Sequence, residues 1–278
     1  MSEERRILIT GAASGIGAAL CRRMAGPGTR FLVHTRCNAQ GAETTAADIR
    51  SVGGTADILL ADLADAGAGR RLVVSAAERL GGLDVLIANA GYALRKPAIE
   101  AGDVAFEAAH GAISRGFFEM ATEAIPHLRA STAGRIIAVS AFGPHVWRTQ
   151  VPAFAVTSAA KASMETMAKA LALDLAPEGI TVNVVSPGFI EKDPGAHFAV
   201  PPETAAVINQ QIPMGRKGSQ DEVAAVIEGS EWGIDSLELR FRGRSGAQPA
   251  RAPTLLQGHG AADAADAPTN NAAVTACP

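Results

Sequence analysis

The stretch RRILITGAASGIG at residues 5–17 joins a short apolar run to a glycine-rich turn. Residues 5–10 have the composition of a buried strand, and the glycines at positions 11, 15 and 17 follow it directly. Such glycines allow a tight turn and close packing of the next helix on the strand. They also let a pyrophosphate approach the free N–H groups at that helix's N-terminus. This stretch therefore predicts a nucleotide-binding strand–turn–helix unit.

Short apolar runs then alternate with longer segments of helical period. The runs are continuously apolar, as expected of parallel strands that are covered on both faces. The regular alternation predicts an α/β fold with a doubly wound parallel sheet, a single domain of Rossmann type. The predicted strands are 5–10, 31–34, 56–60, 84–90, 135–140 and 180–186. The predicted helices are 15–25, 40–52, 66–81, roughly 100–130 and 152–177, the last of which Pro177 and Gly179 help to end.

The C-terminal part of the chain is atypical. The order of strands and helices fades after about residue 228, where SLELRF (236–241) alternates apolar and charged residues and predicts an edge strand. Beyond Arg244, Ala, Gly, Pro and Gln dominate, and such a composition cannot bury enough apolar surface to offset the entropy of ordering. We therefore expect a folded domain over 1–228 and a divergent, largely disordered tail over 229–278.

Composition excludes several classes of protein. The formal net charge is −3, with 25 basic and 28 acidic residues, so no electrostatic footprint for nucleic acid or an anionic membrane is present. No apolar run approaches the roughly 20 residues of a membrane span, and the N-terminus MSEERRILIT is unlike a secretion signal. Three scattered cysteines lack metal-ligand spacing, so we expect no metal site, reduced thiols and a cytoplasmic protein.

Several motifs occur in a fixed order along the chain. TGxxxGIG at 10–17 is followed by Asp62-Leu63 after the third predicted strand and by Asn89-Ala90-Gly91 after the fourth. Gly134-Arg135-Ile136-Ile137 opens the fifth strand, Lys161 lies in the following helix, and Pro187-Gly188 comes after the sixth strand. Over about residues 5–228 this order resembles the short-chain dehydrogenase/reductase family, in particular its 3-oxoacyl reductase-like members.

The resemblance implies an oxidoreductase-like domain that binds a dinucleotide, takes a small-molecule substrate and assembles as a homodimer or homotetramer. The second strand ends in His34-Thr35-Arg36 with no acidic residue to bind the ribose hydroxyls of NAD. Arg36 is placed to pair with a 2′-phosphate, which favours NADP(H) over NAD(H). The expected cofactor-binding residues are Gly11, Ser14, Gly15, Ile16, Gly17, Arg36, Asp62, Leu63, Asn89, Ala90, Gly91, Lys161, Pro187, Gly188 and Ile190.

The resemblance also implies a catalytic tyrosine four residues before Lys161, and that position holds Thr157. The spacing i, i+4 places both side chains on one face of a helix. At the other positions that matter in the family, Ala141 aligns with the usual serine beside Ser140, Ile113 with the asparagine, and Lys192 with a threonine that contacts the carboxamide. The expected catalytic residues are Lys161, Thr157 and Ser140.

A threonine hydroxyl does not titrate in the range in which a phenol does, so Thr157 cannot replace a tyrosine in kind. Thr157 can still donate a hydrogen bond, and Lys161 can supply the proton if burial lowers its pKa. His145 and His197 lie in loops expected to frame the pocket and are further candidates for a base, although most loop histidines are simply solvated. The single tyrosine, Tyr92, follows the NAG motif and is expected to be a packed aromatic.

Three functions follow from these observations. The first is an active NADP(H)-dependent oxidoreductase of carbonyl or alcohol substrates with altered acid–base residues. The second is a catalytically lapsed member that binds the nucleotide as a sensor or partner subunit. The third, non-redox catalysis in a reshaped pocket, ranks lowest because the glycine turn is intact.

Overall fold

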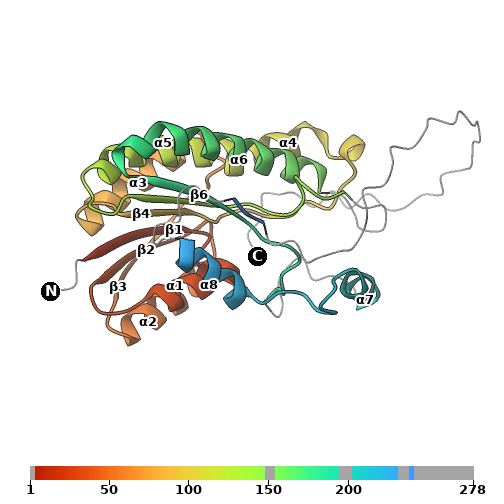
Figure 1. Ribbon diagram of the computed structural model, residues 1–278, viewed down its shortest axis with the longest axis horizontal. Coiled ribbons are helices and arrows are strands. Elements are labelled where there is room, and N and C mark those ends of the chain that lie inside the picture. The colour runs from red at the N-terminus through yellow and green to blue at the C-terminus, as the bar shows by residue number, and fades with distance from the viewer. Residues whose placement is uncertain (1–3, 148–153, 194–201, 231–237, 241–278) are drawn as a thin grey trace, which may run out of the picture.

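The computed structural model describes residues 4–147, 154–193, 202–230 and 238–240. One parallel sheet forms the middle layer, with strand order β3-β2-β1-β4-β5-β6-β7. In Figure 1, α3, α4, α5 and α6 cover one face of this sheet, and α1, α2 and α8 cover the other. The α/β fold of Rossmann type predicted from the sequence is confirmed.

The strands are β1 Arg5–Thr10, β2 Thr29–Thr35, β3 Thr55–Leu60, β4 Val85–Ala88, β5 Arg135–Val139, β6 Thr181–Ser186 and β7 Glu238–Arg240. The α-helices are α1 Gly15–Met24, α2 Ala39–Ser51, α3 Ala68–Leu80, α4 Gly102–Ala109, α5 Gly116–Arg129, α6 Ala155–Leu175, α7 Pro202–Gln210 and α8 Gln220–Ser230. Two single turns of 3-10 helix lie at Ala98–Glu100 and Ala176–Glu178. All six strands predicted before residue 190 are present, with ends that differ by a few residues.

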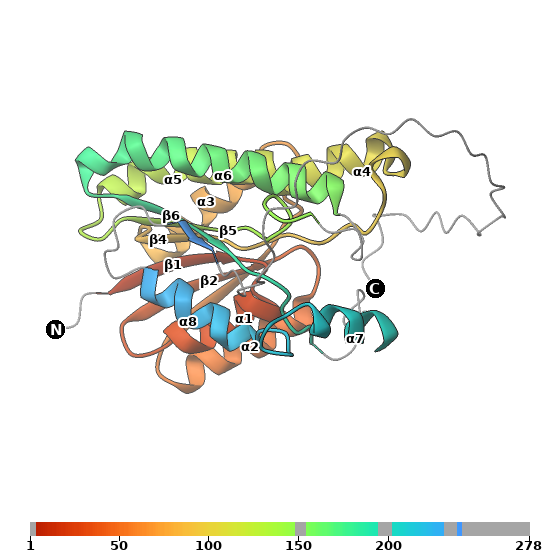
Figure 2. The same cartoon turned by 45° about the vertical axis from the view of Figure 1, so that its right-hand side comes forward.

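The order of the strands reverses between β1 and β4. Ile7 of β1 pairs with Phe31 of β2 on one side and with Val85 of β4 on the other. Chain connections leave this point toward opposite edges of the sheet, and in open α/β sheets such a point, at the carboxyl ends of the strands, is where ligands bind. Figures 1 and 2 agree that α4 and α7 lie at this end of the sheet.

Each central strand contributes side chains to two hydrophobic cores, one on each face of the sheet, because successive side chains point to opposite faces. Leu8, Leu86 and Ile136 pack under α3, α5 and α6, whereas Ile7 and Ile87 pack under α1, α2 and α8. This arrangement explains why the strand sequences are continuously apolar. The edge strand β3 differs, since Ala56 is the only buried residue among its six.

The predicted helix over 100–130 is divided into three parts. A segment of π-helix, His110–Arg115, separates α4 from α5. Gly111 lies directly against the backbone of Ala64, where an added Cβ would be 3.0 Å from the carbonyl oxygen. Such close contact with the loop after β3 is a tertiary constraint that the helical period does not contain. The helix α7 was not predicted from the sequence.

The C-terminal part supplies a short seventh strand. β7 pairs in parallel with β6, with Val184 opposite Glu238 and Ser186 opposite Arg240, so the predicted edge strand is confirmed over three residues. The predicted boundary at 228/229 stays a prediction, and the predicted disorder after Arg244 concerns residues outside the described ranges.

The cysteines agree only in part with the expectation of reduced thiols. Cys21 is free and buried, and burial raises its pKa to about 12. Cys37 is disulfide-bonded, so the expectation is wrong for this residue. Within the described ranges, no helix is both long enough and apolar enough to cross a bilayer.

Candidate functional site

The glycine turn between β1 and α1 is held from the neighbouring strand. The Asn89 side-chain amide donates hydrogen bonds to the carbonyl oxygens of Thr10 (2.9 Å) and Gly11 (3.1 Å). The Thr10 hydroxyl accepts from the backbone N–H groups of Asn89 and Ala90, both at 3.0 Å. A Cβ on Gly17 would lie 2.7 Å from the Asn89 amide nitrogen, so only glycine fits at this point. The TG, GIG and NAG motifs are therefore parts of one packed unit.

The first residue of α1 presents its N–H group to an anion. Gly15 has φ +60°, which favours glycine, and no atom lies within 4 Å of where its Cβ would be. Its N–H donates to the Asp193 carboxylate at 2.8 Å, and the Gln220 amide donates to the other carboxylate oxygen at 2.7 Å. A carboxylate thus already uses the hydrogen-bonding capacity that a phosphate oxygen would use at this helix N-terminus.

A second group of residues surrounds the exit of β2. The hydroxyl of Tyr92 is buried and has no hydrogen-bond partner in the described part of the chain. Burial raises the pKa of Tyr92; the nearby Arg36 guanidinium lowers it and the Asp62 carboxylate raises it further. Asp62 also accepts a hydrogen bond from the Ala64 N–H at 2.9 Å, which fixes the turn after β3. Arg36 is exposed, whereas Leu63 is buried beneath this turn.

The loop after β6 lies on the other side of the α1 N-terminus from the β2 exit. Pro187 is buried at the strand end, and Gly188 and Ile190 are half-buried. Ile190 forms an isolated parallel bridge with Gly218, in which the Gly218 N–H donates to the Phe189 carbonyl at 2.9 Å. This bridge ties the loop to the start of α8 and so places it beside α1.

One face of α6 carries a buried polar stripe. Thr157, Lys161 and Glu165 follow one another at i, i+4 and i+8, and all three are almost fully buried. The Lys161 ammonium donates to the Val139 carbonyl at the end of β5. A Cβ on Gly91 would lie 3.2 Å from Nζ of Lys161, so the NAG motif is in contact with this lysine. Burial lowers the pKa of Lys161 to about 8, and the Glu165 charge opposes this effect.

The Thr157 hydroxyl is bonded to the backbone on both sides. It donates to the Phe154 carbonyl at 3.3 Å and accepts from the Leu94 N–H at 3.4 Å. Both distances are long for hydrogen bonds, so the hydroxyl is weakly held and can be redirected by a substrate oxygen. Thr157 and Lys161 are therefore brought together as predicted, next to the loop that follows β4.

Glu165 is a site residue that the sequence analysis missed. Its carboxylate accepts a hydrogen bond from Ser140 and one at 3.4 Å from Ser186, and it lies 2.9 Å from Nε2 of His145. The His145 side chain is 15% exposed and the Glu165 side chain 4%. The structure thus directs the Ser140 hydroxyl toward Glu165. The spacing of Glu165 four residues after Lys161 was a usable signal, but it does not reveal His145 or the serines.

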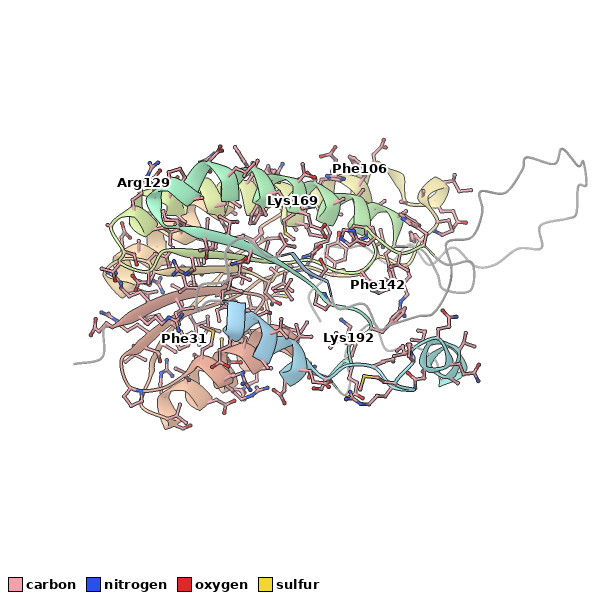
Figure 3. The ribbon with its side chains drawn as sticks, in the orientation of Figure 1. Phe31, Phe106, Arg129, Phe142, Lys169 and Lys192 are labelled. Atoms are coloured by element: carbon pink, nitrogen blue, oxygen red, sulfur yellow. The ribbon has the colours of Figure 1, made fainter. Side chains whose placement is uncertain are left out.

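The remaining predicted positions come from other segments of the chain. Ile113 is buried in the π-helix, and its neighbour Ser114 shares a 2.8 Å hydrogen bond with Ser163 of α6. Phe142, after β5, packs on Phe189, after β6, with ring centroids 4.5 Å apart. Figure 3 shows Phe142 and Lys192 at the same end of the sheet. His197 lies outside the described residues.

The fold and this site together define a class: α/β proteins with a glycine turn after the first strand of a parallel sheet and a buried lysine in contact with the loop after the fourth strand. The sequence model of a family described as Enoyl-(Acyl carrier protein) reductase matches residues 11–228. The chain is 30% identical over 223 residues to 3beta-hydroxysteroid dehydrogenase 1 of Eggerthella lenta, covering 80% of this chain and 84% of that protein. It is 33% identical over 225 residues to cis-4-hydroxycyclohexanecarboxylate dehydrogenase of Sinomonas cyclohexanicum, covering 81% and 88%.

A solved structure agrees with these relatives. The short chain dehydrogenase of Burkholderia cenocepacia in complex with NADP superposes with a TM-score of 0.79 and 28% identity, covering 88% of this chain and 99% of that one. The chain belongs to the short-chain dehydrogenase/reductase family, whose members are oxidoreductases that use NAD(P)(H) on alcohol and carbonyl substrates.

The residues present fit a dinucleotide. The space above Gly15 and the N–H groups at the start of α1 suit a pyrophosphate. The Tyr92 hydroxyl, which has no hydrogen-bond partner among the described residues, lies near Arg36 and Asp62. One feature opposes the fit, since the Asp193 carboxylate must leave Gly15 before a phosphate oxygen can take its hydrogen bond. When bound, the dinucleotide supplies or accepts the hydride in this family's chemistry.

Proposed function

We propose that this chain is an NADP(H)-dependent reductase or dehydrogenase of a carbonyl or alcohol substrate, in which Lys161 exchanges the proton. In this proposal Thr157, Ala141 and Ile113 stand where the family's usual tyrosine, serine and asparagine act. Cofactor binding uses the fifteen residues named in the sequence analysis, among them Gly15, Arg36 and Asn89.

The observation that carries the proposal is the environment of Lys161. An ammonium group with a pKa of about 8 is a competent acid near neutral pH, whereas an ordinary lysine holds its proton too tightly. Burial causes this change, and the contact with Gly91 puts the group beside the loop that follows β4. Lys161 therefore takes over the proton transfer as well as any contact with the cofactor.

In the direction of reduction, Lys161 donates a proton to the substrate oxygen as the carbonyl carbon is reduced. Thr157 orients that oxygen by turning its weakly held hydroxyl from the Phe154 carbonyl toward the substrate. In the direction of oxidation, the neutral amine of Lys161 accepts the alcohol proton. A desolvated site strengthens each of these interactions relative to water.

The preference for NADP(H) rests on Arg36. No acidic side chain ends β2, and Arg36 lies close enough to Tyr92 to affect the phenol's pKa. A guanidinium and a phenolic hydroxyl are both suitable donors to a 2′-phosphate. The cytoplasmic location and the assembly as a dimer or tetramer stay predictions, and sedimentation velocity tests the latter.

A specific observation favours a second candidate, a nucleotide-binding member without efficient turnover. Both hydrogen-bonding functions of the Thr157 hydroxyl are already used by the backbone groups of Phe154 and Leu94. If those bonds persist with substrate, the oxygen has no oriented donor.

One pair of experiments separates the two candidates. NADPH and NADH are titrated by intrinsic fluorescence, and NADPH consumption is followed with a panel of ketones and 3-oxoacyl thioesters. Turnover that Lys161→Met abolishes supports the first candidate. Normal binding without turnover, together with activity created by Thr157→Tyr, supports the second. Failure to bind either dinucleotide contradicts both.

A further inference from the structure

The buried carboxylate of Glu165 has no part in the chemistry described so far. It is 3% exposed, and from α6 it faces the ends of β5 and β6. Burying an ionised carboxylate is costly unless charged or hydrogen-bonded partners compensate for the lost water. An apolar side chain fills such a position at lower cost, so the partners of Glu165 indicate what the carboxylate does.

Glu165 binds two points of the loop that follows β5. The Ser140 hydroxyl, at the start of this loop, donates a hydrogen bond to Oε1 of Glu165. Nε2 of His145, further along the loop, lies 3.0 Å from Oε1 and 2.9 Å from Oε2. The N–H groups of His145 and Val146 donate to the Phe142 carbonyl at 2.9 Å and 3.0 Å, which closes a turn. The carboxylate therefore holds this loop on both sides of Phe142.

The same carboxylate is bonded to the base of the loop that follows β6. The hydroxyl of Ser186, the last residue of β6, donates to Oε1 of Glu165 in a weaker bond of 3.4 Å. That loop carries Phe189, whose ring packs on the ring of Phe142 with centroids 4.5 Å apart. The two loops are therefore joined at their bases by Glu165 and further out by contact between their phenylalanine rings.

These two rings extend to the start of α6. Phe142 packs edge-on against Phe154 with centroids 6.3 Å apart, and the Phe154 carbonyl accepts the hydrogen bond of the Thr157 hydroxyl at 3.3 Å. Phe142, Phe154 and Phe189 are all half-buried, so part of each residue stays accessible. Figure 3 shows Phe142 at the end of the sheet where Lys192 lies. Three aromatic rings from three segments of the chain therefore meet beside the hydroxyl that is proposed to orient the substrate oxygen.

We propose that Glu165 is a positioning residue that fixes both loops so that Phe142 and Phe189 form an apolar wall of the substrate site, which selects carbonyl substrates that carry an apolar ring. The inference rests on the proposed function, because it concerns the substrate of that same site. An apolar ring gains free energy from burial against the phenyl rings and from aromatic packing, whereas a short ketone gains little of either. Glu165 acts through the two loops and does not touch the substrate.

The first test needs no substrate. Amide hydrogen exchange of residues 140–147 is measured by mass spectrometry on the full chain. His145→Leu removes the donor to Glu165 and should speed this exchange about tenfold to a hundredfold, the range for a lost hydrogen bond to a charged group. Glu165→Leu, which removes every bond to the carboxylate, should speed it at least as much, whereas His145→Gln keeps a donor and should stay near the wild-type rate. The matched control is His127→Leu, in the last turn of α5, which should leave this segment unchanged.

The second test compares butan-2-one with 4-phenylbutan-2-one, two methyl ketones that differ by one phenyl ring. NADPH consumption gives kcat and KM for each, and the wild type should show the lower KM for 4-phenylbutan-2-one. In Phe142→Ala and His145→Leu this KM should rise about tenfold, with kcat and the kinetics of butan-2-one little changed. His145→Gln should keep the wild-type preference. A merely structural role of Glu165 predicts equal losses for both ketones.

The outcomes separate this inference from the proposed function. With NADP⁺ in place of NADPH the ketone is not reduced, so calorimetry measures its binding even in a chain that does not turn over. Tighter binding of 4-phenylbutan-2-one that Phe142→Ala weakens, without turnover, supports the wall and refutes the proposed function. Turnover with no preference between the ketones overturns the wall and leaves the proposed function standing.

The role of Glu165 is decided by hydrogen exchange. Exchange of residues 140–147 at the wild-type rate in both Glu165→Leu and His145→Leu overturns it, whether or not the protein turns over. If Glu165→Leu fails to fold, His145→Leu decides alone, since the His145 side chain is 15% exposed and its replacement disturbs the interior less.

Discussion

Replacing Lys161 by methionine tests whether this lysine is as strongly perturbed as its burial implies. Methionine keeps an unbranched side chain of similar length without a charge, so it fills the space between α6 and β5. The pKa of Lys161 is about 8 in the folded chain against an ordinary value of 10.5. Between these two values the unfolded chain binds more protons than the folded chain, so the stability due to Lys161 rises with pH.

The magnitude follows from that interval. Each pH unit changes the free energy of unfolding by at most about 1.4 kcal/mol. The difference in free energy of unfolding, wild type minus Lys161→Met, should therefore rise by about 3 kcal/mol between pH 7.5 and 10.5. The side chain is almost fully buried, so little of this effect is lost to solvent screening. The gain is a difference between two proteins, and the titrations of other groups largely cancel in it.

The assay is urea unfolding of both proteins at pH 7.5, 8.5, 9.5 and 10.5, at one protein concentration. Thr157→Val is the control, since neither side chain titrates in this range and its difference from wild type should be independent of pH. A difference between wild type and Lys161→Met that stays constant within about 0.5 kcal/mol, or that falls with pH, refutes the reasoning.

Three further predictions concern the nucleotide end of the site. Gly17→Ala places a methyl group 2.7 Å from the Asn89 amide nitrogen and should lower the free energy of unfolding in urea by about 2 kcal/mol. Gly26→Ala, with no atom near its Cβ, should not destabilise the protein, and equal unfolding midpoints for the two variants would contradict this prediction. Asp193→Asn should tighten NADPH binding severalfold at low salt, because a carboxylate no longer competes with phosphate at Gly15; weaker or unchanged binding in a fluorescence titration argues against that competition. Arg36→Ala should weaken NADPH binding by about tenfold to a hundredfold and leave NADH binding nearly unchanged; equal losses for both dinucleotides would exclude a contact with the 2′-phosphate.

The extent of the sequence-based prediction differs between the two ends of the site. The nucleotide end was predictable because its requirements are local: a strand, glycines at fixed spacing and the N-terminus of a helix within residues 5–17. Thr157 and Lys161 were also predictable as a pair, since four residues make one turn of a helix. The resemblance to a family supplied the other predicted cofactor-binding positions, including Asn89 and Pro187.

The π-helix was not predictable, because it arises where Gly111 meets the backbone of Ala64. The Glu165 cluster was missed for the same kind of reason. His145, Ser140 and Ser186 lie 20, 25 and 21 residues away from Glu165 along the chain, and no local period relates them. These contacts exist because the ends of β5 and β6 lie next to the same part of α6.

The sequence by itself determined the order of strands and helices, the glycine turn and the spacing of Thr157 and Lys161, since these follow from local periodicity and backbone conformation. Only the tertiary structure decided what those residues can do. Burial between β5 and α6 lowers the pKa of Lys161, and packing of separate segments brings Asp193 to Gly15 and His145 to Glu165. Desolvation and charge pairing depend on neighbours in space, and local sequence patterns do not determine which residues those neighbours are.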